Sequence, residues 1–252
     1  MNAAPTPPVL DVRGVHCVLG GQTILSNLSL RIEAGERVAL IGPNGAGKST
    51  LFQAISGLLP LRTGSIWLAG QRIDRLHPSQ IALAGLGRSF QSPQVFGALS
   101  VADNLRGALV ARQRPRHWWR QRAGDASLEH ETQHWLDVLR LQTCADIPAQ
   151  QIDYARLRAL ELGLGLLGQA PLLLLDEPTA GMSRAQAEHM LDLIEHVCAD
   201  RTLLLIEHDH DAVFRLASRV VVLHQCQVLA DGTPTQIRED ARVRAVYLGT
   251  AP

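Results

Sequence analysis

Lysine is almost missing from this sequence of 252 residues. Among the 24 Lys and Arg residues, Lys48 is the only lysine, and all the others are arginines. Asp and Glu also number 24, so the formal net charge is zero. No overall basic field therefore favours nucleic acid as a partner. Because a guanidinium and a compact ammonium are not interchangeable, the single lysine indicates a position that requires an ammonium group.

Cysteines and long apolar runs are also scarce. The four cysteines are Cys17, Cys144, Cys198 and Cys226. They have no paired spacing, which argues against a zinc site or a disulfide framework and fits a reducing compartment. Residues 1–8 lack the segments of a signal peptide and are expected to form a flexible tail. The longest apolar stretch, 160–175, is interrupted by a glutamate and a proline, so any work at a membrane would be peripheral.

Lys48 lies in GPNGAGKST, residues 42–50, which fits the phosphate-loop pattern G-x-x-x-x-G-K-S/T. Residues 37–41 are expected to form a buried strand before it, and residues 49–55 to begin a helix. Backbone N–H groups of such a loop converge on phosphate oxygens, and the helix N-terminus adds partial positive charge. Lys48 is expected to reach the β- and γ-phosphates, and the Ser49 hydroxyl to bind Mg²⁺. The predicted nucleotide-binding residues are Gly42, Pro43, Asn44, Gly45, Ala46, Gly47, Lys48, Ser49 and Thr50. The alternative is a flexible glycine loop with an accidental lysine and serine.

Strand and helix patterns alternate on both sides of a helical middle section. Further strands are expected at residues 9–18, 24–32, 64–70, 172–175, 202–206 and 220–223, and helices at 184–198 and 211–217. Between about residues 88 and 160, helical patterns dominate. This order predicts a largely parallel α/β sheet that is buried on both faces. The predicted division is an α/β core at 9–87 and 164–252, with a helical insert at 88–163.

The insert carries a cluster of arginines with two tryptophans among them. Its members are Arg106, Arg112, Arg114, Arg116, Trp118, Trp119, Arg120 and Arg122. The favoured interpretation is a solvated face of a helix and loop, since runs of charge are commonly exposed. Contact with lipid headgroups or with a membrane partner is the other interpretation.

Asp176 and Glu177 follow a run of four leucines that is expected to form a buried strand. A carboxylate at such a strand end can hold hydrated Mg²⁺ opposite Ser49. The next carboxylate can orient or deprotonate the water that attacks the γ-phosphate. The alternative is that both acids lie in a polar loop before Pro178.

Two other residues are weaker candidates for the same site. Gln91 lies where the core gives way to the insert and is a candidate to reach Mg²⁺ or the attacking water. His208 follows a later strand and is a candidate to hydrogen-bond the γ-phosphate. Taken alone, each is more often a surface residue than a catalytic one.

The order of a phosphate loop, a glutamine before a helical insert, Asp-Glu-Pro and Glu-His-Asp resembles the ATP-binding subunit of ABC transporters. The resemblance extends over about residues 9–248. Segments GLGRSFQSPQVFGALSVADNL (85–105), DEPTAGMS (176–183), IEHDHDAVF (206–214) and VYLG (246–249) look closest to the subunits of branched-chain amino acid and urea importers. The resemblance implies an α/β fold, with a RecA-like P-loop ATPase core, an antiparallel β patch and a helical subdomain. It also implies ATP and Mg²⁺ as cofactors, with Ser49, Gln91 and Asp176 at the metal and Glu177, His208 and Gln91 in catalysis.

The resemblance further implies partners and a place of action. Two ATPase subunits would sandwich two ATP molecules beneath membrane-spanning permeases, at the cytoplasmic face of the inner membrane. A periplasmic or external solute-binding protein would act indirectly, and nucleic acid would have no part. The expected function is ATP-driven import of branched-chain amino acids, urea or a related small solute. The alternative is a regulatory subunit that binds nucleotide and hydrolyses it weakly. A soluble ABC protein of translation or repair is disfavoured, because the sequence has neither a second ATPase module nor a long coiled-coil insert.

The sequence departs from the family at the signature segment, leucine-serine-x-glycine-glutamine. The matching segment here runs from Ile152 through Asp153, Tyr154 and Ala155 to Arg156. In the family, the serine hydroxyl and the glycine backbone hold the γ-phosphate of the ATP on the opposite subunit. Asp153 sets a negative charge there and Ala155 adds a Cβ. At about 1.5–3 kcal/mol for each lost hydrogen bond to a charged group, turnover would fall by roughly 10²–10⁴. Arg156 would compensate only if it reached a phosphate oxygen.

A milder departure is Leu19, which stands where the family commonly stacks an aromatic ring on adenine. The signature departure bears on assembly, because in this family each site takes its phosphate loop from one subunit and its signature from the other. A homodimer would have two impaired sites. A heterodimer with a subunit that bears an intact signature would have one working site on this chain. The sequence therefore predicts a heterodimer.

Overall fold

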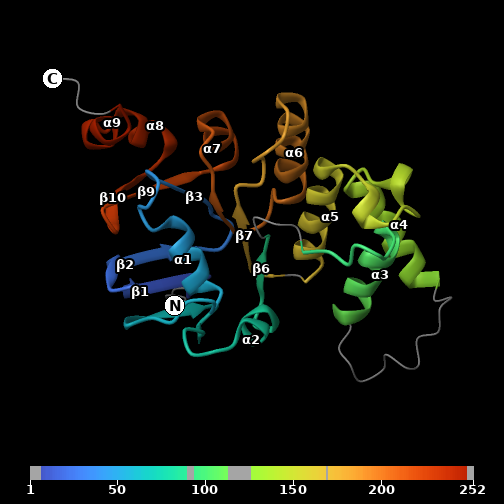
Figure 1. Ribbon diagram of the computed structural model, residues 1–252, viewed down its shortest axis with the longest axis horizontal. Coiled ribbons are helices and arrows are strands. Elements are labelled where there is room, and N and C mark those ends of the chain that lie inside the picture. Colours follow the sequence, from blue (N-terminus) through green and yellow to red (C-terminus); the bar gives the residue numbers. More distant parts are fainter. Residues whose placement is uncertain (1–6, 90–93, 113–125, 169, 249–252) are drawn as a thin grey trace, which may run out of the picture. The chain divides into compact units, whose positions relative to one another are not determined.

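The computed structural model describes residues 7–89, 94–112, 126–168 and 170–248 (Figure 1). The chain divides into two compact units. The first consists of Met1–Arg88, Pro171–Glu177 and Asp200–Pro252, and the second of Ser89–Ala170 and Pro178–Ala199. All strands among the described residues belong to the first unit. The functional division into a core at 9–87 and 164–252 and a subdomain at 88–163 stays a prediction.

The first unit contains, in the described part of the chain, a six-stranded sheet with the order β10-β9-β3-β8-β7-β6. Its strands are β3 (Arg37–Ile41), β6 (Leu86–Arg88), β7 (Leu172–Asp176), β8 (Leu203–Ile206), β9 (Arg219–His224) and β10 (Gln227–Gly232). All neighbours are parallel except β10, which pairs antiparallel with β9 at the edge. The four strands expected here are confirmed to within one residue at each end, whereas β6 and β10 were not expected.

The register of this sheet places the carboxyl ends of its central strands level with one another. Leu40 of β3 pairs with Ile206 of β8, and Asp176 of β7 pairs with the same Ile206. The strands themselves are runs of buried leucine and valine, as a parallel sheet covered on both faces requires. Consequently the residues that follow β3, β7 and β8 leave the sheet along one edge.

A second, antiparallel sheet in the first unit has the order β2-β1-β4-β5. Its strands are β1 (Leu10–Leu19), β2 (Gln22–Ile32), β4 (Thr63–Leu68) and β5 (Gln71–Arg72). Helix α1 (Lys48–Ile55) buries Leu51, Phe52 and Ile55 completely, in an apolar cluster that includes residues of both sheets. The expected α/β core with an antiparallel patch is therefore confirmed.

Four more helices complete the described part of the first unit. They are α2 (Pro78–Leu83), α7 (His210–Leu216), α8 (Pro234–Glu239) and α9 (Ala241–Leu248). The N-cap of helix α7 is Asp209, whose side chain accepts hydrogen bonds from two backbone N–H groups of the first turn. The N-cap of helix α8 is Thr233, which forms a reciprocal capping box with Gln236. Figure 1 shows α8 and α9 beside β9 and β10, with which they are in contact.

The second unit is helical in its described residues. Its helices are α3 (Val101–Arg112), α4 (Ala126–Val138), α5 (Tyr154–Leu167) and α6 (Arg184–Val197). Helix α3 packs on α4 and α5, and α5 packs on α6. Gly163 of α5 leaves room for the side chain of Leu139, which a Cβ at this position would meet. No helix in the described ranges is long and apolar enough to cross a membrane.

Two members of the arginine cluster lie among the described residues, and both face acids. Arg106 Nη2 is 2.8 Å from Glu129 Oε2, and Arg112 Nη2 is 2.6 Å from Glu131 Oε1. These pairs join α3 to α4 in a partly exposed setting, as the solvated-face interpretation expects. The other six members lie at positions 114–122, outside the described residues.

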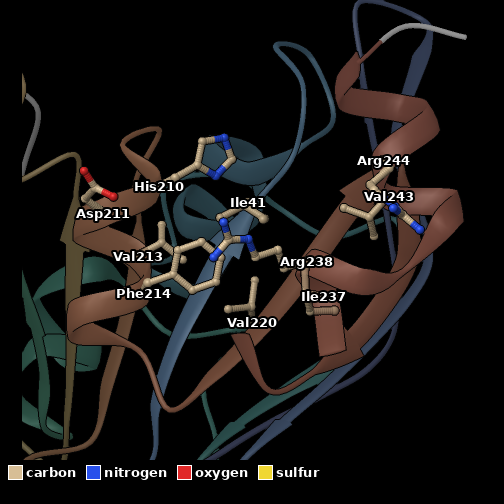
Figure 2. A pocket seen from close by; sticks show the side chains of 10 residues that line it. All are labelled: Ile41, His210, Asp211, Val213, Phe214, Val220, Ile237, Arg238, Val243 and Arg244. Atoms are coloured by element: carbon tan, nitrogen blue, oxygen red, sulfur yellow. The ribbon is translucent and has the colours of Figure 1, made fainter. Parts of the chain in front are cut away.

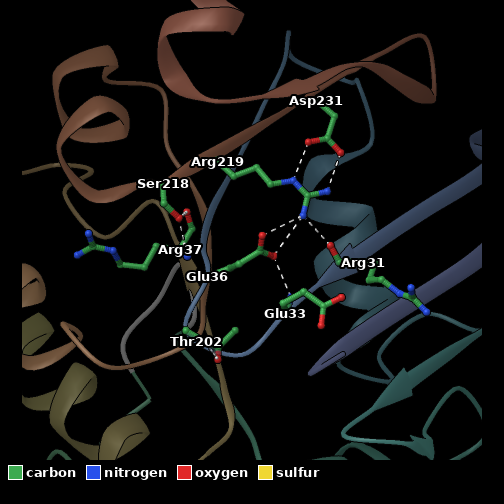
Figure 3. A network of polar contacts seen from close by, with 9 residues as sticks. Arg31, Glu33, Glu36, Arg37, Thr202, Ser218, Arg219 and Asp231 are labelled. Carbon is green, nitrogen blue, oxygen red and sulfur yellow. Dashed lines mark hydrogen bonds and ion pairs between the residues drawn. The ribbon is translucent and has the colours of Figure 1, made fainter. Parts of the chain in front are cut away.

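An arginine at the start of β9 ties together the segments that flank the phosphate-loop strand (Figure 3). Arg219 donates from Nε and Nη2 to the two oxygens of Asp231, each at 2.7 Å. Its Nη1 donates to the Arg31 carbonyl at 2.9 Å and to Glu36 Oε2 at 3.2 Å. The hydrogen bond to Asp231 is the main cause that raises the pKa of Arg219. One guanidinium therefore holds β2, β10 and the turn before β3.

The substitution Arg219→Gln is expected to lower the free energy of unfolding by about 1–2 kcal/mol. It removes several charged hydrogen bonds, each discounted for partial exposure. Urea unfolding followed by circular dichroism measures this change. Arg242→Gln is the control, because among the described residues Arg242 forms an ion pair only with the nearby Asp240 and its side chain is 66% exposed. Equal stability losses in the two variants would contradict the prediction.

Candidate nucleotide-binding site

The phosphate loop joins the end of β3 to the start of α1, and its glycines have backbone conformations that other residues rarely adopt. The φ angles of Gly42, Gly45 and Gly47 are 152°, 79° and 104°. A Cβ at Gly42 would also meet the Leu223 carbonyl, and one at Gly47 would lie 2.7 Å from the Ile24 carbonyl oxygen. Glycine is therefore required by the local backbone as well as by a close approach of phosphate.

Lys48 is buried inside this loop, with only 6% of its surface exposed. Its Nζ donates to the Gly42 carbonyl at 2.6 Å and to the Pro43 carbonyl at 3.0 Å. Burial lowers the pKa of Lys48, and the charges of Glu177 and Asp176 act in the opposite direction. The ammonium thus lies within electrostatic range of both predicted catalytic-site acids and is held by carbonyls that a phosphate can replace.

The two acids at the end of β7 occupy different environments. Asp176 is the last residue of the strand and is 2% exposed. Glu177, the next residue, has a φ angle of +48° and donates its N–H to the Ile206 carbonyl at 2.9 Å. A left-handed conformation costs a non-glycine residue about 1–3 kcal/mol, and such strain is concentrated at functional sites. The hydrogen bond to β8 keeps the backbone in this turn, which directs Glu177 away from the strand.

His208 contacts Glu177 directly. Its Nε2 is 2.9 Å from Glu177 Oε1, and its backbone N–H donates to Glu207 Oε2 at 3.0 Å. Glu207 is 4% exposed, whereas the His208 side chain is 48% exposed. The buried acid therefore holds the backbone of His208 while the ring stays open to solvent and to the carboxylate of Glu177.

Arg88 is a residue of this site that the sequence analysis did not identify. It ends β6, and its Nη2 lies 3.9 Å from Asp176 Oδ2. Its Nη1 donates to the Phe52 carbonyl of α1 at 3.4 Å. Burial lowers the pKa of Arg88, and the charge of Asp176 raises it. Arg88 lies three residues before Gln91, at the end of a short segment that contains a glycine. Such a strand has too few residues to show a period, so the sequence contained no clear signal for Arg88.

The substitution Arg88→Gln is expected to lower the free energy of unfolding by about 2 kcal/mol. It removes the guanidinium that faces a buried carboxylate. Breaking a close buried ion pair costs about 3–5 kcal/mol. The expected loss is smaller here because the two charged groups are 3.9 Å apart. Thermal unfolding at neutral pH provides the measurement. Arg72→Gln breaks the more exposed pair with Asp74 and should cost clearly less than Arg88→Gln, so an equal or larger loss in that control would overturn the prediction.

The remaining predicted residues fall in several places. Ser49 is exposed and Thr50 half-buried at the start of α1. Leu19 ends β1 and is 56% exposed. Gln91 lies outside the described residues. The structure thus brings Lys48 and its loop together with Asp176, Glu177 and His208, all within the first unit.

The signature segment lies in the second unit, and its last three residues, from Tyr154 to Arg156, form the start of helix α5. Asp153 is the N-cap, and its Oδ1 accepts a hydrogen bond from the Arg156 N–H at 3.0 Å. Arg156 Nη1 lies 3.3 Å from Asp153 Oδ2. The Asp153 carboxylate therefore offsets the partial positive charge of the helix N-terminus. Arg156, the candidate for compensating contact with a phosphate oxygen, is thus paired with the Asp153 carboxylate.

A glycine loop that encloses a buried lysine, with two acids and a histidine at neighbouring strand ends, defines a phosphate-loop ATPase. The family model for ABC transporters matches residues 25–180. A second model, for branched-chain amino acid ATP-binding cassette transporters, matches residues 227–252. The chain belongs to the ATP-binding subunits of ABC transporters and is an ATPase whose hydrolysis is coupled to transport.

Several known proteins resemble the chain over nearly its full length. The high-affinity branched-chain amino acid transport ATP-binding protein BraF of Pseudomonas aeruginosa is 33% identical, over 97% of this chain and 99% of its own. LivG of Escherichia coli, of the same description, is 34% identical with the same coverage. LptB of Escherichia coli, a lipopolysaccharide export ATP-binding protein, is 31% identical over 91% of this chain and 92% of its own.

A crystal structure of an ATP-binding cassette of an ABC transporter in its ADP conformation is also similar. It has a TM-score of 0.78 and 25% identity, and the match covers 97% of this chain and all of that one. The expected RecA-like core with an antiparallel patch and a helical subdomain is therefore confirmed, as is the expected family.

Proposed function

We propose that the chain is the ATPase subunit of an importer for branched-chain amino acids. The support is the family model over residues 227–252 together with the relatives BraF and LivG, whose descriptions name these solutes. Urea or a related small solute is the alternative cargo. The subunit acts at the cytoplasmic face of the membrane beneath transmembrane permeases, which receive the solute from a periplasmic or external binding protein.

In this proposal, the phosphate loop at 42–50 cradles the triphosphate. Lys48 exchanges its hydrogen bonds to the loop carbonyls for oxygens of the β- and γ-phosphates. Glu177 accepts a proton from the attacking water, and His208, which contacts it, orients that carboxylate and donates to the γ-phosphate. Leu19 covers the adenine base from the end of β1.

The donor groups at the site fit Mg²⁺. Asp176 and Ser49 offer a carboxylate and a hydroxyl oxygen, which are the hard ligands that this ion prefers. With Gln91 they would hold the ion, which neutralises charge on the phosphates when it is bound. Asp176 is buried and would be a rigid ligand, whereas Ser49 is exposed and open to the nucleotide.

We further propose that the chain works as one half of a heterodimer of two different ATPase subunits. The observation that carries this proposal is the Asp153 cap, because an anionic N-cap repels the γ-phosphate that a signature helix must bind. The site that uses the phosphate loop of this chain and an intact signature from the partner hydrolyses ATP. The same cap also favours a second candidate function, that of a nucleotide-binding subunit with weak hydrolysis that regulates its partner.

Reconstitution tests both proposals. Candidate permeases and a second ATPase subunit that carries an intact signature segment are expressed with this chain, purified and placed in vesicles with ATP inside. Leucine uptake that requires all the subunits, and that Lys48→Ala in this chain abolishes, is the expected result. Uptake that survives Lys48→Ala would favour the regulatory function. Rapid, cooperative ATP hydrolysis by this chain alone would contradict the heterodimer.

A further inference from the structure

A pocket of about 580 Å³ lies in the first unit between α7 and the two C-terminal helices (Figure 2). Its apolar walls come from two strands and three helices and are formed by Ile41, Val213, Val220, Ile237 and Val243. Binding sites for small organic molecules have volumes of about 300–1,000 Å³ and mostly apolar linings with a few polar groups. The pocket therefore has the size and the walls of a ligand site, and no residue from 42 to 50 lines it.

One arginine extends across these apolar walls. The guanidinium carbon of Arg238 in α8 is 5.8 Å from the centre of the Phe214 ring in α7. In Figure 2 it reaches toward Phe214 and Ile41, whereas the Asp211 carboxylate turns away from it. Within the described part of the chain, Arg238 has no ion pair with a carboxylate. His210 and Arg244 also line the pocket, so cationic and imidazole groups predominate over its single acid.

This combination complements a small carboxylate that carries a branched aliphatic chain. Arginine binds carboxylates through two parallel hydrogen bonds. The branched side chains of valine and isoleucine offer apolar surface to an aliphatic group, whose removal from water is favourable. A bare anion would satisfy only the guanidinium, and an uncharged hydrocarbon would satisfy only the walls.

The walls of the pocket continue directly into the ATPase site. Ile41 immediately precedes Gly42, the first residue of the phosphate loop. The N-cap of helix α7 is Asp209, next to His208, whose Nε2 lies 2.9 Å from Glu177 Oε1. A ligand that contacts Ile41 and α7 therefore affects the positions of both the phosphate loop and His208.

We propose that this pocket binds a small branched aliphatic carboxylate, either the imported amino acid or the 2-oxo acid made from it, and that its occupation lowers ATP turnover. The choice of ligand rests on the proposed function. The ligand stabilises the arrangement described here, in which Lys48 Nζ donates to the Gly42 and Pro43 carbonyls and must leave them to reach the phosphates. A ligand shifts such an equilibrium only by binding one arrangement more tightly than the other, so inhibition and affinity are linked.

Titration calorimetry of the full-length chain tests the binding, with leucine and with its 2-oxo acid as the two probes. We expect saturable binding of at least one, weakened at least tenfold by Arg238→Gln and unchanged by the control Arg242→Gln. Tighter binding of leucine identifies the imported solute as the ligand, and tighter binding of the 2-oxo acid identifies its metabolic product. Absence of binding by both, or an unchanged affinity in Arg238→Gln, overturns the proposal.

Two further measurements complete the test. The better ligand should lower ATP turnover of the reconstituted transporter when it is present on the cytoplasmic side, and Arg238→Gln should abolish this inhibition without changing turnover in its absence. Unchanged turnover at saturating ligand overturns the regulatory role. Inorganic phosphate, the probe for a bare anion, should not displace the ligand, and full displacement by phosphate also overturns the proposal.

Failure of this inference is distinguishable from failure of the proposed function. Leucine uptake by the reconstituted transporter without leucine or 2-oxo acid binding to the isolated chain refutes the pocket alone. Binding to the isolated chain with no leucine uptake refutes the importer function and leaves the pocket as a site on an ATPase with another cargo.

Discussion

Replacing Glu177 by glutamine is expected to lower ATP turnover by about 10²–10⁴, the range typical of a lost general base. The amide keeps the size of the side chain and a hydrogen bond to His208, so the geometry of the turn after β7 should persist. The affinity for ATP should change little, because in the proposed function the phosphates are bound by the loop and by Lys48. Turnover is measured as phosphate release by the complete transporter, and affinity by binding of a fluorescent ATP analogue to the chain.

Glu239→Gln is the matched control, because it makes the same chemical change at an exposed position on α8. It should leave turnover unchanged. If Glu177→Gln kept more than a tenth of the normal turnover with intact nucleotide binding, Glu177 would not be the general base. A loss of nucleotide binding instead would indicate that the acid serves mainly to hold the metal or the loop.

The double substitution Asp153→Ser with Ala155→Gly is expected to raise ATP turnover of the purified chain about 10²-fold. It restores the hydroxyl and the small residue of the family signature, and two recovered hydrogen bonds to phosphate correspond to the lower end of the predicted 10²–10⁴ loss. Serine caps a helix about as well as aspartate, so α5 should still begin at this residue. The measurement is phosphate release at saturating Mg²⁺ and ATP, with protein concentrations high enough for dimers.

Asp153→Asn separates the charge from the missing donor. Asparagine also caps helices, and it removes the negative charge. If Asp153→Asn by itself raises ATP turnover, repulsion by the carboxylate causes the impairment. If turnover rises only when the serine and the glycine are both present, lost hydrogen bonds cause it. A gain of less than tenfold in the double variant would show that the segment is compatible with catalysis, and a homodimer would again have to be considered.

Secondary structure was predictable from sequence where apolar patterns are long or uniform. Strand β3 and the leucine-rich β7 were predicted to within one residue, because continuous apolar runs that end in charged or glycine residues are typical of buried parallel strands. The short edge strand β6 and the C-terminal helices α8 and α9 were not predicted. Strand β6 and helix α8 have too few residues to show a period, and Val243 is the one buried residue among the described side chains of α9.

The signature segment shows the limit of reasoning from a pattern alone. The sequence showed that Asp153 replaces a serine, but it left open whether Arg156 would compensate. The structure pairs Arg156 with Asp153, because an N-cap carboxylate and a basic residue three positions later face each other across the first helical turn. The structure thus supplies a local partner for Arg156 that the spacing alone did not give, and compensation by Arg156 at the phosphate stays a prediction.

The sequence by itself determined the family and the positions of the phosphate-loop motif and of the Asp-Glu pair, because each rests on residue types at short, fixed separations along the chain. Only the tertiary structure decided that Arg88 faces Asp176, that His208 contacts Glu177 and that Arg238 lies over a pocket beside them. These contacts join residues from strands and helices that are far apart in the sequence. Their distances depend on sheet register and packing, and no local pattern records either of these.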